Sequence, residues 1–263
     1  MLVDLAHSLY VVISTVITIV ILILATIYLK EQKPKDVFLK FFAIITVILH
    51  YSGLWVDFLS TGTAEAGSAL LFAVYPCHVC MWLLVASAFI KNRKTIGYRF
   101  VTEFTFYLGI VGGVLGIALN FNYMGNPTLA DWSVLQGLLS HSTLIIGCVW
   151  LLCGKYIKIR VFNTISILLG MSLLLIDGVF VNTLFEYCKI GSVNSMYLLE
   201  PPVASMPWFN TAFMGILAIV VGFLITATYE QIALPKEDRW YSHLAYWYNK
   251  KYKKKTKTEK EEE

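Results

Sequence analysis

The chain has 263 residues and a net charge of +4, with 57% hydrophobic and only 14% charged residues. Soluble proteins carry much more charge, so this composition leaves no room for a separate soluble domain. It also argues against nucleic acid as a partner, because the basic residues lie in short gaps between apolar runs and in a C-terminal tail.

Apolar runs of about 18 or more residues are long enough to cross a bilayer as helices. The first run starts with MLVD rather than with a basic segment, so we expect a retained span and not a cleaved signal peptide. The predicted fold is an all-α integral membrane protein, a seven-transmembrane-helix bundle that forms one domain over residues 1–235. In chain order the predicted spans are 8–29, 37–59, 68–90, 104–120, 133–153, 163–185 and 210–229.

The 21 Lys and Arg residues predict the orientation of the bundle. All except Lys189 fall in alternate gaps, after the first, third and fifth spans and in the tail. Positively charged loops remain on the cytoplasmic side. The sequence therefore predicts a multi-pass protein with its N-terminus outside and its C-terminus cytoplasmic, in the plasma membrane if the source is bacterial.

The C-terminal tail divides into two segments. Over residues 236–252, Trp and Tyr residues recur at roughly helical spacing beside lysines, which predicts an amphipathic helix in the headgroup region. Residues 253–263 are almost wholly Lys, Glu and Thr. They have nothing to bury, so we expect a disordered charged tail.

The five cysteines do not indicate a disulfide scaffold. An odd number cannot pair completely, and four of them lie in apolar spans, where a thiol usually behaves as a small hydrophobe. Two of them form a CxxC motif, but no second ligand pair accompanies it at metal-site spacing. We therefore expect no metal site and no redox site. The cysteines are Cys77, Cys80, Cys148, Cys153 and Cys188.

Polar side chains gather at one depth in the predicted spans. Such groups are costly in a membrane and tend to face the bundle interior or a wet cavity. At 1.5 Å per residue, almost all of them fall in the outer half, the deepest roughly 12 Å below the surface. This predicts a cavity open to the outer leaflet or the outside. The residues are His50, Asp57, Cys77, His78, Asn120, Asn122, His141, Asp177, Asn182, Asn210 and Thr211.

These groups leave more than one class of function open. A thiol, an imidazole base and a carboxylate are what nucleophilic acyl transfer needs. A proton-coupled transporter would use the same His and Asp residues as a relay, but only the third span has an internal proline, which argues against the interrupted helices of transporters. The seventh span has no Lys for a retinal Schiff base, although topology alone leaves a receptor open.

Three segments carry a resemblance to one family. Residues 75–79, YPCHV, closely match a segment of the transmembrane protein 164 family. Residues 135–152, LQGLLSHSTLIIGCVWLL, are similar to the helix with the conserved His in that family and its bacterial YwaF-type relatives. Residues 194–202, NSMYLLEPP, with Pro207 and Trp208, resemble the double-proline loop of YwaF-type proteins. The resemblance covers the second to the seventh span.

The resemblance implies a membrane-embedded acyltransferase that moves a fatty acyl chain from a phospholipid to a lysophospholipid without coenzyme A or another cofactor. Carried over to this chain, Cys77 forms the acyl-cysteine intermediate and His141 is the general base and acid. Many bacterial relatives have a different residue in place of Cys77, so its role rests on the Pro-Cys-His-Val match. A proton-coupled transporter and a lipid hydrolase remain the alternatives.

The predicted third helix supports this assignment in physical terms. Pro76 removes a backbone donor and is expected to open the hydrogen-bond ladder just before Cys77. His78 points about 100° away from Cys77 on a helix, so we expect His141 to be the base and His78 to contact the substrate or the oxyanion. We expect Asp177 within one or two hydrogen bonds of a histidine. The supporting or substrate-binding candidates are His50, Asp57, His78, Asp177, Asn182 and Tyr197.

Overall fold

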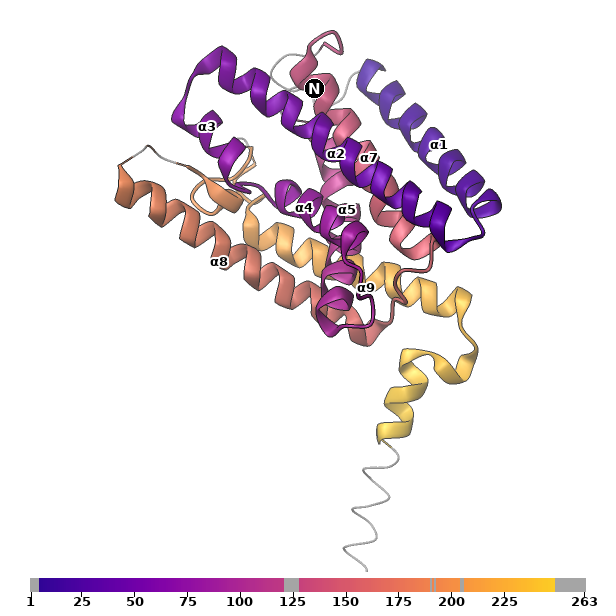
Figure 1. The fold of residues 1–263 in the computed structure, drawn as a ribbon. Helices are drawn as coiled ribbons and strands as arrows, with labels where there is room; N and C mark the ends of the chain where they lie inside the picture. Colours follow the sequence, from indigo (N-terminus) through magenta and orange to yellow (C-terminus); the bar gives the residue numbers. More distant parts are fainter. Residues whose placement is uncertain (1–4, 121–127, 190, 192, 204–205, 249–263) are drawn as a thin grey trace, which may run out of the picture.

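The structure is a computed structural model that describes residues 5–120, 128–189, 191, 193–203 and 206–248, except for the side chains of 64, 65 and 68. Among these residues, seven helical segments are long and apolar enough to cross a membrane, so the predicted all-α seven-span fold is confirmed (Figure 1). Asn122 and the tail 253–263 lie outside the described residues. The long helices are α1 (Leu5–Tyr28), α2 (Gln32–Thr61), α4 (Pro76–Phe89), α5 (Ile96–Ala118), α7 (Trp132–Cys153), α8 (Ile165–Cys188) and α9 (Thr211–Ala233).

The centre of the bundle is formed by α5 and α7, and α2 and α4 pack against them. In α5 and α7, 61% of the apolar span is buried, compared with 6% in α1, which packs along the outside against α7 (Figure 1). Glycines let α5 approach α7 closely. A Cβ at Gly113 would meet Ile145, and a Cβ at Gly116 would meet the ring of His141. Small residues are the usual means of close helix packing in membranes, where no hydrophobic effect drives the helices together.

The third span is not one continuous helix. The prediction of a single helix over 68–90 is wrong, because four residues, 72–75, separate the end of α3 (Ala64–Leu71) from Pro76, where α4 begins. Proline suits the first position of a helix, since no donor is needed there, and it holds the preceding residue in an extended conformation. Tyr75 has that conformation, with φ −119° and ψ 153°. Cys77 therefore lies in the first turn of a helix rather than in the middle of one.

A distant loop satisfies the backbone of this break. The backbone N–H of Met196 donates to the carbonyl of Val74 at 2.8 Å, and the hydroxyl of Ser195 donates to the same carbonyl at 3.2 Å. Both donors belong to the short 3-10 helix η2 (Ser195–Tyr197), which follows α8. Irregular backbone at membrane depth is tolerated when protein covers it in this way.

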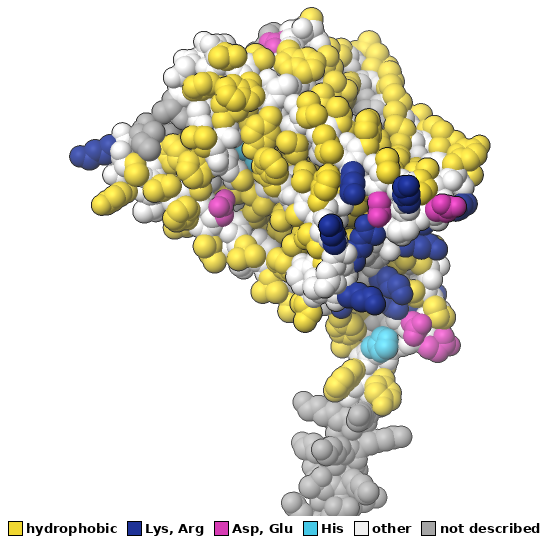
Figure 2. Space-filling view, viewed as in Figure 1, with side chains coloured by type: hydrophobic (Ala, Val, Ile, Leu, Met, Phe, Trp, Pro, Cys, Tyr) yellow, Lys and Arg dark blue, Asp and Glu magenta, His cyan; other side chains and the backbone are white. Residues whose placement is uncertain are grey.

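Charged side chains gather at one end of the bundle (Figure 2). Asp36 forms a salt bridge of 2.8 Å with Arg93 and accepts a hydrogen bond of 2.6 Å from the hydroxyl of Tyr156. Burial, together with the bond to Asp36, raises the pKa of Tyr156, so this phenol stays a donor at neutral pH. The contacts join the loop after α4, the loop after α7 and the start of α2.

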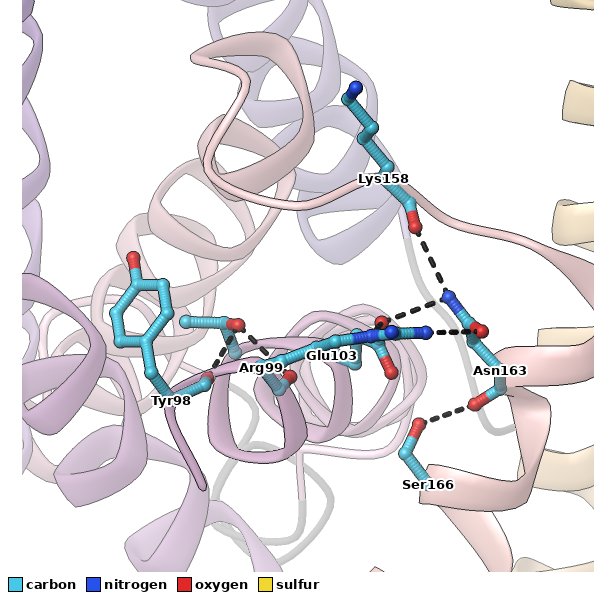
Figure 3. A network of polar contacts seen from close by, with 7 residues as sticks. Tyr98, Arg99, Glu103, Lys158, Asn163 and Ser166 are labelled. Atoms are coloured by element: carbon cyan, nitrogen blue, oxygen red, sulfur yellow. Dashed lines mark hydrogen bonds and ion pairs between the residues drawn. The ribbon is translucent and has the colours of Figure 1, made fainter. Parts of the chain in front are cut away.

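A second network at this end connects α5 to the start of α8 (Figure 3). Arg99 donates to Glu103 at 2.8 Å and to the side-chain carbonyl of Asn163 at 2.6 Å. The amide of Asn163 donates to Glu103 at 3.0 Å and to the backbone carbonyl of Lys158 at 3.3 Å. Asn163 lies in the 3-10 turn η1 (Val161–Thr164). The buried carboxylate of Glu103 is thus fully engaged in holding the loop that precedes α8.

The segment after α9 is attached to the bundle by one buried carboxylate. Glu230 accepts hydrogen bonds from the backbone N–H of Val161 at 2.7 Å and of Trp240 at 2.8 Å. The turn η3 (Lys236–Asp238) leads into a helix over residues 240–248, where the description of the tail ends. The location of this helix in the headgroup region stays a prediction.

The orientation of the bundle also stays a prediction, and a labelling experiment tests it. Cys188 ends α8 at the opposite end from the charged networks and is exposed. A membrane-impermeant maleimide should label it in intact cells. In a Cys188→Ser background, a cysteine introduced by Lys94→Cys should react only after permeabilisation, because the loop after α4 is predicted to be cytoplasmic. The opposite pattern of labelling would reverse the orientation.

Candidate active site

The thiol of Cys77 has two imidazoles as its closest polar neighbours. His78 follows Cys77 in the first turn of α4, and His50 reaches it from α2. The sulfur and one ring nitrogen from each histidine all lie within 4.8 Å of one another. His50 is 7% exposed and His78 is 1% exposed, whereas Cys77 is half-buried. Cys77 is therefore the least enclosed member of this group, which we call the thiol–imidazole cluster.

Several ring nitrogens of the cluster have no partner among the described residues. The rings of His50 and His78 lie 4.3 Å apart between centroids. His78 hydrogen-bonds to the backbone of Phe72 in the break before α4, but its Nδ1 is unpartnered, and so are both ring nitrogens of His50. Leaving a buried polar atom without a hydrogen bond costs about 1–3 kcal/mol. Buried atoms without a partner therefore indicate that the site binds something else, such as a proton, a reacting group or a ligand.

His141 is a third imidazole beside the cluster. Its Nδ1 lies 2.6 Å from the carbonyl oxygen of Gly137, one turn earlier in α7. A carbonyl only accepts, so Nδ1 carries the proton and the lone pair is on Nε2, which is the form that acts as a base. The ring lies against Gly116 of α5, where a Cβ would occupy the same space. The ring centroids of His141 and His50 are 6.5 Å apart.

Two tyrosines cover the cluster on the side of the double-proline loop. Tyr75 stacks on Tyr197 with ring centroids 5.1 Å apart, and it meets the ring of His78 edge-on, also at 5.1 Å. Burial raises the pKa of Tyr197 well above its usual value, with smaller contributions from Cys77 and Tyr75. The phenol of Tyr197 therefore remains protonated at neutral pH.

The loop that carries Tyr197 is held by hydrogen bonds on both sides. Asn182 of α8 accepts from the N–H of Ser195 at 2.8 Å and donates to the Ser195 carbonyl at 3.3 Å. The hydroxyl of Thr211 lies 2.6 Å and 2.8 Å from the carbonyl oxygens of Met196 and Tyr197. Met196 and Tyr197 both have left-handed backbone conformations, with φ of 53° and 54°. Strain of this kind costs about 1–3 kcal/mol per residue and persists only where surrounding contacts enforce it.

The structure brings some of the predicted site residues together and leaves others apart. The structure brings together His50, Cys77, His78 and Tyr197, and His141 lies beside them. Asn182 instead holds the loop that carries Tyr197. Asp57 lies near Asp131, which caps α7. The prediction that Asp177 lies within one or two hydrogen bonds of a histidine is wrong. Its Oδ2 is buried without a partner in the described structure.

The expected open cavity also differs from the structure. His50 and His78 are enclosed, because the loop around Tyr197 folds inward and is bonded to Val74. Within the thiol–imidazole cluster, only Cys77 retains partial exposure.

Two residues of the site were not assigned a role from the sequence. Tyr75 precedes the proline of the YPCHV segment, and its stacking on Tyr197 is a contact between residues far apart in the chain. Gln136 of α7 lies against Gly53 of α2, and its Oε1 is buried without a partner among the described residues. A polar amide within an apolar helix is the signal in the sequence that could have identified Gln136.

Cys80 is separated from the cluster although it lies one turn after Cys77. Its sulfur donates to the carbonyl of Thr105 at 3.7 Å and contacts Cys148, and both sulfurs lie against Gly109. Cys80 therefore faces α5 and α7, whereas Cys77 faces α2 and the loop with Tyr197. The two thiols have different neighbours, and only that of Cys77 has imidazoles beside it.

The anchoring of the loop leads to a prediction. Asn182→Ala should remove two hydrogen bonds and cost about 1–3 kcal/mol of loop stability. Since each 1.4 kcal/mol is a factor of ten, Cys77 should react with N-ethylmaleimide about tenfold faster. Asn210→Ala is the matched control, because Asn210 caps α9 through the N–H of Phe213 and its hydrogen bonds among the described residues do not involve η2. Equal rates for both variants would show that this loop does not cover the thiol.

The fold and the site together define a class of protein: a multi-pass helical membrane protein with a thiol and three imidazoles gathered in its bundle. A family model described as the TMEM164 family matches residues 2–229. The chain belongs to this family, and the match includes the first helix, which the segments read from the sequence do not cover. No curated protein and no solved structure matches the chain.

Proposed function

We propose that this protein is a membrane-embedded acyltransferase that moves a fatty acyl chain from a phospholipid to a lysophospholipid through an acyl-cysteine intermediate on Cys77, without coenzyme A. The observation that carries this proposal is the thiol–imidazole cluster, in which half-buried Cys77 lies beside two enclosed imidazoles. A cysteine and a histidine within reach of each other are the two groups that thiol-based acyl transfer needs.

The position of Cys77 at a helix start supports the role of nucleophile. The first N–H groups of a helix have no partner within the helix, and they carry its positive dipole end. Here the backbone N–H groups of Cys77 and His78 lie beside the sulfur, and that of His78 also donates to the carbonyl of Tyr75 at 3.0 Å. Donors in this place stabilise a thiolate, and they lie beside the point where an oxyanion forms when the sulfur attacks a carbonyl.

We assign His141 as the base and His50 as a relay between it and the thiol. A nitrogen of His50 lies within 4.8 Å of the sulfur, and its ring centroid is 6.5 Å from that of His141. Both nitrogens of His50 are unpartnered in the described structure. One nitrogen of His50 takes the thiol proton while the other gives its own proton to Nε2 of His141. The fixed Nδ1–H of His141 keeps that Nε2 ready to accept.

The proposed transfer has two balanced steps. In the first step, the sulfur attacks the ester carbonyl of the donor phospholipid, a thioester forms, and the C–O bond breaks. The proton held by the histidines goes to the departing alkoxide, which leaves as a lysophospholipid. In the second step, the hydroxyl of the acceptor lysophospholipid gives its proton back to the histidines and attacks the thioester, and the thiol is restored with that proton.

The same intermediate would give a hydrolase if water replaced the acceptor hydroxyl. Enclosure favours transfer, because a site that excludes water protects a reactive thioester from hydrolysis. His50 and His78 are almost fully enclosed, and apolar helices surround them. A proton-coupled transporter is less well supported, because among the described spans only the one that contains Pro76 is interrupted, whereas transporters use pairs of interrupted helices.

The proposal is tested with the purified full-length protein in vesicles. The vesicles contain phosphatidylcholine with one isotope-labelled acyl chain and an unlabelled lysophosphatidylethanolamine as acceptor. Mass spectrometry should find the label in diacyl phosphatidylethanolamine and an equal amount of new lysophosphatidylcholine, with no added coenzyme A. Labelled free fatty acid in place of the diacyl product would favour the hydrolase. No change in either lipid, across several donor and acceptor headgroups, would contradict acyl transfer.

A further inference from the structure

The thiol–imidazole cluster also has the chemistry of a metal site. We propose that Cys77, His50 and His78 bind a single zinc ion, and that zinc holds the protein in an inactive state. The metal site stands on the geometry of the three side chains, whereas the inactivation rests on the proposed acyl transfer. The two parts are therefore tested separately.

The spacing of the three donors fits one ion. The sulfur and a nitrogen from each histidine all lie within 4.8 Å of one another. Zinc binds sulfur at about 2.3 Å and histidine nitrogen at about 2.0–2.1 Å, so the donors of a tetrahedral site lie about 3.5 Å apart. Small rotations of the side chains close the difference. The three donors come from α2 and from the first turn of α4, so the ion would join two helices of the bundle.

The unpartnered nitrogens are the independent reason to expect a ligand. His50 and His78 are at least nine-tenths buried, and three of their four ring nitrogens have no hydrogen bond among the described residues. A relay through His50 uses its two nitrogens only briefly, during transfer, and leaves Nδ1 of His78 unexplained. An ion bound by one nitrogen from each ring gives Nδ1 of His78 a partner while the protein is at rest, and it leaves one nitrogen of His50 unpartnered instead of two.

The donor types select the kind of ion. One thiolate and two imidazoles suit zinc and other soft or borderline divalent ions, whereas calcium and magnesium require oxygen ligands. A bound thiolate leaves one net positive charge in the site rather than two. Three protein donors also leave the fourth position of a tetrahedral ion open. No metal site was predicted from the CxxC pair, and Cys80 of that pair is in fact engaged with Thr105 and Cys148.

Binding would withdraw the groups that the proposed transfer uses. The thiol of Cys77 loses its proton to solvent, a sulfur–metal bond forms, and no oxidation takes place. The sulfur lone pair that attacks an ester is then shared with the ion, and a nitrogen of His50 is no longer available to take a proton. Micromolar zinc would thus turn off acyl transfer, and a chelator would restore it.

Cobalt is the spectroscopic probe for the metal site. The purified full-length protein in nanodiscs should bind one Co²⁺ with a thiolate-to-cobalt charge-transfer band, and zinc should abolish that band. Cys77→Ala should remove the band, and His50→Ala should weaken Co²⁺ binding at least tenfold. Cys80→Ala is the matched control and should keep both. The metal site is wrong if no band forms, if the band survives in Cys77→Ala, or if Cys80→Ala weakens binding as much as His50→Ala.

The inactive state is tested on the same preparation. The zinc concentration that halves acyl transfer in vesicles should agree with the zinc dissociation constant obtained from displacement of cobalt at known cobalt concentrations. If acyl transfer continues at full rate with zinc bound, the proposed inactivation by zinc is wrong, but the proposed metal site still stands. A cobalt band in a protein that moves no acyl chain would retain the metal site and contradict the proposed function.

Discussion

Cys77→Ala should abolish acyl transfer, whereas Cys80→Ala should leave most of it. The expected loss is about 10³-fold or more, because removing a nucleophile stops covalent catalysis altogether. The contrast is sharp since the two cysteines lie one turn apart on α4 at nearly the same depth. Only Cys77 has imidazoles within 4.8 Å, and Cys80 faces Thr105 and Cys148. The rate of appearance of labelled diacyl product in vesicles measures the effect.

The same variants are compared by covalent labelling with a lipid-like electrophile. Labelling should disappear in Cys77→Ala and persist in Cys80→Ala, Cys148→Ala and Cys153→Ala. Melting curves in detergent verify that each variant is folded. Normal transfer by Cys77→Ala would show that the nucleophile is assigned wrongly, and a proton-coupled transporter would then become the leading hypothesis.

Loss of either His141 or His50 should slow acylation of the thiol by about 10² or more, the usual effect of removing a general base. His141→Ala removes the Nε2 that the Gly137 contact leaves free, and His50→Ala removes the link to the thiol. His243→Ala is the matched control, because His243 is exposed in the segment after α9. Single-turnover formation of the thioester, followed by quenching and mass spectrometry, gives the rates.

Two further measurements separate proton transfer from a structural role. Added imidazole should restore part of the rate in His50→Ala or His141→Ala, which loss of folding would not allow. Both variants should also keep the labelling of Cys77 by a small maleimide, because the thiol itself remains in place. An unchanged acylation rate in His141→Ala would leave His50 or His78 as the base.

Hydropathy was sufficient to predict the seven spans, because apolar length alone determines which segments cross a bilayer. It was not sufficient to predict the break before Pro76. The apolar run continues through residues 72–75. The carbonyl of Val74, which no helix satisfies, is bonded to a loop about 120 residues later in the chain. A contact of that range leaves no periodic signal in the sequence. Pro76 marked the position correctly, but whether a proline kinks a helix or starts one depends on what covers the freed backbone.

The candidate site was predicted in part for a related reason. Counting residues from the membrane surface gives depth, and depth grouped His50, Cys77, His78 and His141, which the structure also brings near one another. Depth does not say which face of a helix a residue occupies. Asp177 was therefore grouped with the histidines although it bonds to none of them in the described structure.

The loop with Tyr197 posed a different difficulty. Its sequence marked it as functional, but its inward fold depends on bonds from Asn182 and Thr211 on the two flanking helices, α8 and α9. The contact of Tyr197 with Tyr75 arises from the same inward fold and has no local signal.

The acyl-cysteine intermediate can be observed directly by mass spectrometry of the intact protein. The full-length protein is incubated with donor phospholipid and no acceptor, then acid-quenched. The proposed mechanism predicts one added acyl chain on Cys77, and this chain should be absent from Cys77→Ala. Neutral hydroxylamine should release it, because it cleaves thioesters. The added chain should also be lost when lysophospholipid is supplied. An adduct that persists in Cys77→Ala, or transfer that proceeds in the wild type while no adduct forms at any time, would contradict a covalent mechanism through Cys77.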